Sequence, residues 1–203
     1  MVLWLAPSRS CLLRGATFAA KILAAAGLRF EIRPSQIDER AVEVESGIAD
    51  AAAVARHLAR AKAQAVASSL PGRLVLVPIK RLHAGQNVLP SRPIVHGSRR
   101  AVARIAPAGV HELHSALALV RDNEIMFARV DTARLAMRDF SDRFLNGYLD
   151  MAGNAATRSV GGYQLEGIGI HLFERVEGDF LRFSAYRFCR CLAFLRQDKF
   201  VDV

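Results

Sequence analysis

The residues from Ser159 to Asp179 interleave glycines with side chains that could do chemistry. The stretch reads SVGGYQLEGIGIHLFERVEGD, and Tyr163, Gln164 and Glu166 lie between its glycines. Glycine lets a backbone turn sharply and lets a ligand approach closely, and loops held by a rigid strand often carry binding residues. A ligand-binding loop is one interpretation. The other is a hairpin loop with solvated polar groups, since a glycine cluster alone is a weak signal.

A second candidate is Lys62, within the alanine-rich stretch 51–70. Helical spacing places Lys62 one turn beyond Leu58, on the flank of an apolar stripe. An ammonium group there could contact a phosphate, or it could simply be solvated. The pattern alone favours neither interpretation.

Composition limits the classes of protein to which the chain can belong. Its 203 residues suffice for one sizeable core, and 52% hydrophobic with 23% charged residues is typical of a globular chain. The net charge of +9 favours an anionic partner such as a nucleotide or a nucleic acid. Three cysteines, Cys11, Cys189 and Cys191, form neither a disulfide framework nor a metal motif. We therefore expect a reduced, cytoplasmic protein, and the short apolar start at Met1 predicts no membrane segment.

Helices and strands alternate along the chain, which predicts an α/β fold. Helices are expected at 18–28, at 51–70 after the candidate cap Asp50, and after Ser141; strands are expected at 29–35, 73–77 and 170–179, with a hairpin over 111–137 that turns at 121–124. In the helix over 51–70, core spacing is expected for Val54, Leu58, Ala61 and Ala65. We predict one domain over 1–203.

Two stretches interrupt this order. Residues 78–110 are basic, carry four prolines and show no sustained period. A loop of such length inside a compact domain is improbable. Residues 180–191 are again aperiodic and basic before a final helical piece. Both aberrant stretches, counted as 77–110 and 180–191, require an explanation.

Several stretches, in this order, resemble the Maf-like nucleoside triphosphate pyrophosphatases. They are AAKILAAAGLRFEIRPSQIDER, HLARAKAQAVA, GVHELHSALALV, FSDRFLNGYLD and SVGGYQLEGIGIHLFERVEGD. The resemblance implies a mixed β-sheet flanked by helices, with two lobes around a central nucleotide cleft, as in inosine triphosphatase-like folds. It also implies hydrolysis of a nucleoside triphosphate to a monophosphate and pyrophosphate with a divalent cation, Mg²⁺ or Mn²⁺.

The resemblance also implies roles for individual residues. Glu39 of IDER matches the family's acidic position near the metal and phosphates, and Lys62 matches the lysine of its helix motif. Glu166 stands where many members have glutamine and is a candidate base or phosphate contact, beside Gln164 as a substrate-binding residue. Arg92, before Pro93, replaces the family's phosphate-binding lysine.

Other family motifs are missing. Ala16 and Ala19 fall about where the first motif has a serine and an arginine, and Val77, Pro78 and Ile79 stand on the positions of Gly-Ala-Asp, whose aspartate is the presumed general base. Isoleucine can neither accept a proton nor bind a metal. Loss of a general base typically costs about 10²–10⁴-fold in rate. We therefore expect little or no activity from this chain.

Out-of-frame translation would account for these losses. Synonymous codons for Leu76 to Leu82 permit Gly-Ala-Asp-Gln-Thr-Leu when reading begins one base early. The same slip over 11–19, 88–95 and 181–187 permits the other missing motifs. Codons incompatible with the shifted readings would end this hypothesis.

Two functions of different classes remain open at this point. One is an inherited pyrophosphatase, with a nucleotide as partner, no specific nucleic acid, no membrane, and a homodimer as one expected assembly. The other is a non-catalytic nucleotide- or RNA-binding remnant that uses the positive charge, although its arginines lack the aromatic interleaving of single-strand binders.

Overall fold

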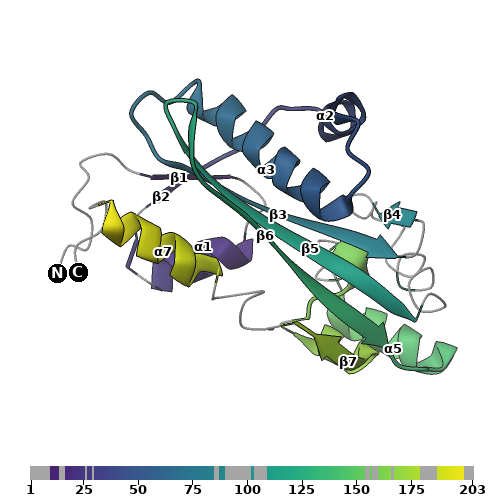
Figure 1. The fold of residues 1–203 in the computed structure, drawn as a ribbon. Coiled ribbons are helices and arrows are strands. Elements are labelled where there is room, and N and C mark those ends of the chain that lie inside the picture. Colours follow the sequence, from purple (N-terminus) through teal and green to yellow (C-terminus); the bar gives the residue numbers. More distant parts are fainter. Residues whose placement is uncertain are drawn as a thin grey trace. The chain divides into compact units, whose positions relative to one another are not determined.

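A computed structural model describes residues 10–13, 17–25, 27–28, 30–84, 87–89, 102, 109–153, 156, 160–165, 167–178 and 187–198. The strands are β1 (Ser10–Leu13), β2 (Phe30–Arg33), β3 (Val75–Ala84), β4 (Asn87–Leu89), β5 (Val110–Arg121), β6 (Glu124–Met137) and β7 (Phe173–Glu177). The helices are α1 (Thr17–Ala25), α2 (Glu39–Ser46), α3 (Ala51–Ala67), α5 (Asp142–Ala152) and α7 (Arg187–Gln197), with 3₁₀ turns η2 (Val160–Gly162) and η3 (Ile168–Leu172) (Figure 1).

The chain forms two compact units. The first comprises residues 1–79, 115–131 and 181–203, and the second comprises residues 80–114 and 132–180. The strands β3, β5 and β6 each contribute residues to both units. Our single-domain prediction for 1–203 stays a prediction.

The first unit is a sheet covered by helices on both faces. Its strands follow the order β2-β1-β3-β5-β6, and β1 is parallel to both β2 and β3. On one face, small residues of α3 pack on β3 and β5 in a cluster that includes Ala59, Ala63, Val75, Val77, Ile79, Ala116 and Ala118. On the other face, α1 and α7 pack through Leu23, Leu195 and Cys191 on Leu76 and Leu117. The predicted mixed sheet with flanking helices is therefore confirmed.

The second unit contains the other ends of the shared strands. There β4 pairs antiparallel with β3, and β7 pairs antiparallel with β6 with an irregularity at Ala136 and Met137. Helix α5 begins after Ser141, whose Oγ accepts a hydrogen bond from the Phe144 backbone N–H at 3.2 Å. The predicted cap and helix are confirmed.

The predicted hairpin is also confirmed, and its turn has a clear local cause. Asp122 and Asn123 adopt φ values of +49° and +65°. These left-handed conformations are the ones that a two-residue type I′ turn requires, and Asn and Asp tolerate them better than most residues. Asp122 Oδ1 accepts a hydrogen bond from the Gly72 backbone N–H at 2.6 Å, which ties the turn to the loop before β3.

Some predictions about elements were wrong. The regular pattern does not end at Pro78, because β3 continues through it to Ala84. The described pairs of β3 with β1 lie at Val75 and Leu76, and those with β4 begin at Leu82. Pro78 therefore falls between the segment of β3 that pairs with β1 and the segment that pairs with β4.

The expected core positions of α3 were also partly wrong. Ala65 is exposed and Ala61 is half-buried, whereas Ala55, Ala59 and Ala63 are fully buried. The buried face of α3 includes Lys62, Ala63, Val66 and Ala67 in place of Ala61 and Ala65. The final helix likewise begins earlier than expected, at Arg187.

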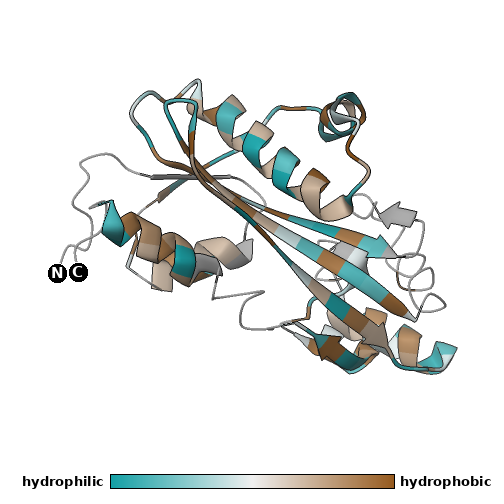
Figure 2. Ribbon diagram, viewed as in Figure 1, coloured by the Kyte–Doolittle hydropathy of each residue, from teal (hydrophilic) through white to brown (hydrophobic). Residues whose placement is uncertain are grey.

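Hydropathy along the ribbon agrees with this packing (Figure 2). Hydrophilic and hydrophobic residues alternate along α3, as expected for a helix that packs one side against a sheet and exposes the other. Among the described residues, no helix is long and apolar enough to cross a membrane.

Candidate active site

Glu39 and Lys62 meet in the first unit. Asp38 caps α2 by accepting hydrogen bonds from the backbone N–H groups of Arg40 at 2.9 Å and Ala41 at 3.2 Å, which fixes Glu39 in the first helical turn. Lys62 comes from the buried side of α3. Its Nζ lies 2.6 Å from Glu39 Oε1, with side-chain exposures of 10% for the lysine and 31% for the glutamate. The structure thus brings together two of the residues selected from the sequence.

This pair has the charges that a triphosphate requires. An ammonium group can neutralise phosphate oxygens, and a carboxylate can orient water or a cation. Lys62 is largely buried within the unit, whereas Glu39 is more open to solvent. An incoming polyphosphate would compete with Glu39 for the ammonium group, leaving the carboxylate to face the cation that accompanies the nucleotide.

The divalent cation that the resemblance implies would fit Glu39 together with a bound nucleotide. Within the described part of the chain, Glu39 belongs to no group of three or more potential ligands. Mg²⁺ is commonly held by one or two carboxylates plus substrate phosphates rather than by a preformed protein cage. The donor set therefore suits a metal that binds with the nucleotide.

The glycine-rich loop is anchored in the second unit by two buried tyrosines. Tyr148 Oη donates to the Gly162 carbonyl at 3.0 Å, and burial raises the pKa of this tyrosine to about 12. Tyr163 Oη lies 2.7 Å from His111 Nε2, inside a cluster of rings completed by Phe173. Tyr163, singled out for chemistry, is thus a structural anchor.

Gln164 is exposed at the surface of this loop. Its backbone lies against Gly169: a Cβ on Gly169 would come within 2.9 Å of the Gln164 N and C atoms and closer still to its O. Gly161 and Gly162 adopt φ values of +82° and +78°. The glycines are therefore required by the loop's own shape, as the sequence indicated.

The remaining selected residues give a divided result. Glu166 and Arg92 lie outside the described residues, so their roles stay predictions, as does that of Ala16. Ala19, at the position of the family's arginine, is a buried core residue of α1. Val77 and Ile79, at positions of the Gly-Ala-Asp motif, are 0% and 6% exposed and pack beneath α3.

Sequence reasoning missed a polar cluster in the second unit, formed by His83, Glu112 and His114. Potential ligand atoms of the three side chains all lie within 4.8 Å of one another. The spacing of Glu112 and His114 on an expected strand could have indicated a shared face. His83 gave no signal, because it falls in a stretch without a regular pattern.

Comparisons with known proteins establish the family. The family described as "Maf-like protein" matches this chain over residues 19–182. This chain therefore belongs to the Maf-like protein family, and the resemblance seen in its motifs is confirmed.

Curated relatives match almost from end to end. A "Nucleoside triphosphate pyrophosphatase" of Rhodopseudomonas palustris (strain BisB18) is 40% identical over 98% of both chains. A protein of the same name from Nitrobacter winogradskyi is 43% identical over 86% of each chain. Another, from Bradyrhizobium diazoefficiens, is 38% identical over the full length of each chain. Among solved structures, the Staphylococcus aureus Ham1 protein aligns with 94% of this chain and 100% of its own at 9% identity, with a TM-score of 0.48.

Proposed function

We propose that this protein is a nucleoside triphosphate pyrophosphatase that hydrolyses a nucleoside triphosphate to the monophosphate and pyrophosphate. The observation that carries the proposal is its 40% identity, over 98% of both chains, to a relative of that name. The ion pair of Glu39 and Lys62 supports it, because these residues match the acidic and basic positions of the family's motifs.

In this reaction a water oxygen forms a bond to the α-phosphorus while the bond from that phosphorus to the bridging oxygen breaks. The departing pyrophosphate carries away the electron pair, and Lys62 would stabilise its negative charge. Glu39 would orient the attacking water and hold the divalent cation, Mg²⁺ or Mn²⁺. When bound, that cation would supply positive charge to the phosphate oxygens.

We propose that turnover by this chain is weak. Val77, Pro78 and Ile79 offer no side chain that accepts a proton, so the proton of the attacking water would pass to solvent or to Glu39. Roles for Gln164, Glu166 and Arg92 in holding the substrate remain part of the same proposal.

The deciding experiment measures pyrophosphate release from a panel of nucleoside triphosphates with Mg²⁺ or Mn²⁺. A variant in which residues 77–80 become Gly-Ala-Asp-Gln is assayed beside the natural chain. We expect activity to increase by about 10²-fold or more when the missing base is restored. Equal turnover by both proteins would mean that another group serves as base. Absence of pyrophosphate release from both proteins would contradict the proposal.

A non-catalytic nucleotide- or RNA-binding role is the second candidate, favoured by the net charge of +9. Binding to RNA that needs no divalent cation and falls steeply with salt would support it. Metal-dependent pyrophosphate release would instead support the pyrophosphatase.

We further propose a cytoplasmic homodimer. Cys189 and Cys191 carry free thiols, which is typical of a reducing compartment. Met151 on α5 is 77% exposed beside an apolar groove that Phe144 and Ile168 also line. Light scattering on the purified chain tests the assembly, and a monomeric mass would contradict it.

A further inference from the structure

We propose that His83, Glu112 and His114 form a binding site for a divalent transition metal such as Zn²⁺. One ligand atom from each residue lies within 4.8 Å of the other two. His114 is buried, and His83 and Glu112 are half-buried. The site is separate in chemistry from the nucleotide-bound cation proposed for Glu39, and it does not depend on pyrophosphatase activity.

Strand alternation explains how the three side chains converge. Successive residues of a strand point to opposite faces, so Glu112 and His114 of β5 share one face. Ala116 and Ala118 follow at the same alternate positions and pack beneath α3. On β3, His83 follows Val77 and Ile79 at alternate positions in the same way. The rings of His83 and His114 lie 6.3 Å apart between centroids.

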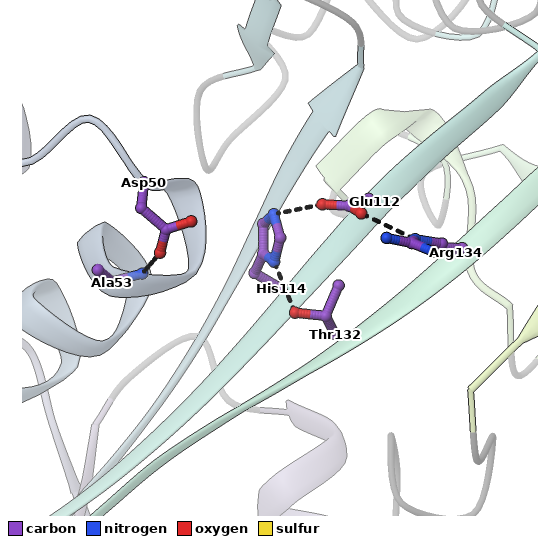
Figure 3. Close-up of polar contacts among 6 residues, drawn as sticks. All are labelled: Asp50, Ala53, Glu112, His114, Thr132 and Arg134. Carbon is purple, nitrogen blue, oxygen red and sulfur yellow. Dashed lines mark hydrogen bonds and ion pairs between the residues drawn. The ribbon is translucent and has the colours of Figure 1, made fainter.

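Neighbouring groups orient both ligands of β5, as Figure 3 shows. His114 Nδ1 lies 2.9 Å from Thr132 Oγ1, while its Nε2 faces Glu112 Oε2 at 3.5 Å. The other carboxylate oxygen, Oε1, accepts a hydrogen bond from Arg134 Nε at 3.0 Å. Thr132 thus supports Nδ1 of His114, and Arg134 supports Oε1 of Glu112. The second ligand atoms of these residues, His114 Nε2 and Glu112 Oε2, face each other. Such outer partners typically orient metal ligands and select the histidine tautomer.

The donor set indicates the class of metal. Two imidazoles and one carboxylate suit Zn²⁺, Co²⁺ or Ni²⁺, whereas Mg²⁺ prefers oxygen ligands. Three protein ligands leave at least one position for water. Arg134 adds positive charge beside Glu112, so we expect weaker binding than at a fully buried structural zinc site.

Binding of Co²⁺ by the full chain tests the proposal. The chain is freed of metal with a chelator, titrated with Co²⁺ while visible absorption is recorded, and then titrated with Zn²⁺ in competition. We expect one equivalent to bind, with ligand-field bands that disappear as Zn²⁺ replaces Co²⁺. His83→Ala and Glu112→Gln should each weaken binding by about tenfold or more, and Thr132→Val should weaken it less.

His171→Ala is the matched control, because it removes an exposed imidazole from the same unit. It should bind Co²⁺ as the unchanged protein does. Circular dichroism establishes that each variant is folded, and His83 is preferred to the buried His114 for that reason. Absence of Co²⁺ binding by the unchanged protein, or equal affinity of folded His83→Ala and His171→Ala, would overturn the proposal. Pyrophosphate release with Mg²⁺ by His83→Ala reports separately on the proposed function.

Discussion

The same strands carry different chemistry in the two units of this protein. In the first unit, alternate positions of β3 and β5 hold Val75, Val77, Ala116 and Ala118, all fully buried beneath the alanines of α3. In the second unit, the same alternation continues with histidine and glutamate on those strands. The two-residue alternation of a strand therefore determines which side chains share a face of the sheet. The types of those residues decide whether that face forms a hydrophobic core or a polar binding site.

The two polar groups differ as well. In the first unit, an ammonium group and a carboxylate form one ion pair, which suits a polyphosphate and its cation. In the second, imidazole nitrogens and a carboxylate converge, which suits a transition metal. Substitutions confined to one unit should therefore have separable effects on turnover, stability and metal binding.

The largest effect is expected at the ion pair of the first unit. Lys62→Met should reduce pyrophosphate release by roughly 10²-fold or more, since it removes the charge that stabilises the leaving group. The assay is best done in the variant restored at 77–80, where turnover is expected to be higher. Arg60→Met, which removes an exposed cation from the same helix, is the control and should change the rate little. Equal losses in both variants would mean that only overall charge matters.

His111 should make the second unit sensitive to acid. This residue is 1% exposed, and burial lowers its pKa from 6.5 to about 4. Between these values the unfolded chain binds a proton that the folded chain excludes, so this stabilising contribution is complete above 6.5 and is lost as the pH falls toward 4. The loss amounts to about 3 kcal/mol at most.

Urea denaturation across this pH range measures that contribution. His111→Gln should flatten the pH dependence of the free energy of unfolding relative to that of the unchanged protein. Identical pH profiles for the natural chain and His111→Gln would contradict the prediction.

Two glycines of the second unit should respond oppositely to alanine. Gly169→Ala places a Cβ against the backbone of Gln164 and should destabilise the protein by about 1–3 kcal/mol. Nothing lies within 4 Å of the position that a Cβ would take on Gly147 of α5, so Gly147→Ala should stabilise by about 0.5–1 kcal/mol. Thermal unfolding of both variants tests the pair, and stabilisation by Gly169→Ala would contradict the tight approach.

An effect as small as that of Gly147→Ala is expected at the cap of α3 in the first unit. Asp50 Oδ1 accepts a hydrogen bond from the Ala53 backbone N–H at 2.7 Å (Figure 3). Asp50→Ala should cost about 1 kcal/mol of stability, and Asp50→Ser should retain most of it. Hydrogen exchange should report the loss in α3, with Co²⁺ affinity of the second unit unchanged.

Local patterns in the sequence determined much of this protein. Alternating residues around Asp122 and Asn123 predicted the hairpin, and Asp50 and Ser141 predicted two helix starts, because caps and turns depend on neighbours in the chain. Motif resemblance selected Glu39 and Lys62. These features needed no knowledge of distant contacts.

Tertiary structure decided the rest. Helical spacing left Lys62 as either a solvated or a functional residue, and only the packing of α3 against the sheet buries it beside Glu39. Pro78 concealed the continuation of β3, since a strand is stabilised by partners far away in sequence. The convergence of His83 with Glu112 and His114 likewise depends on pairing between strands, which no local pattern specifies.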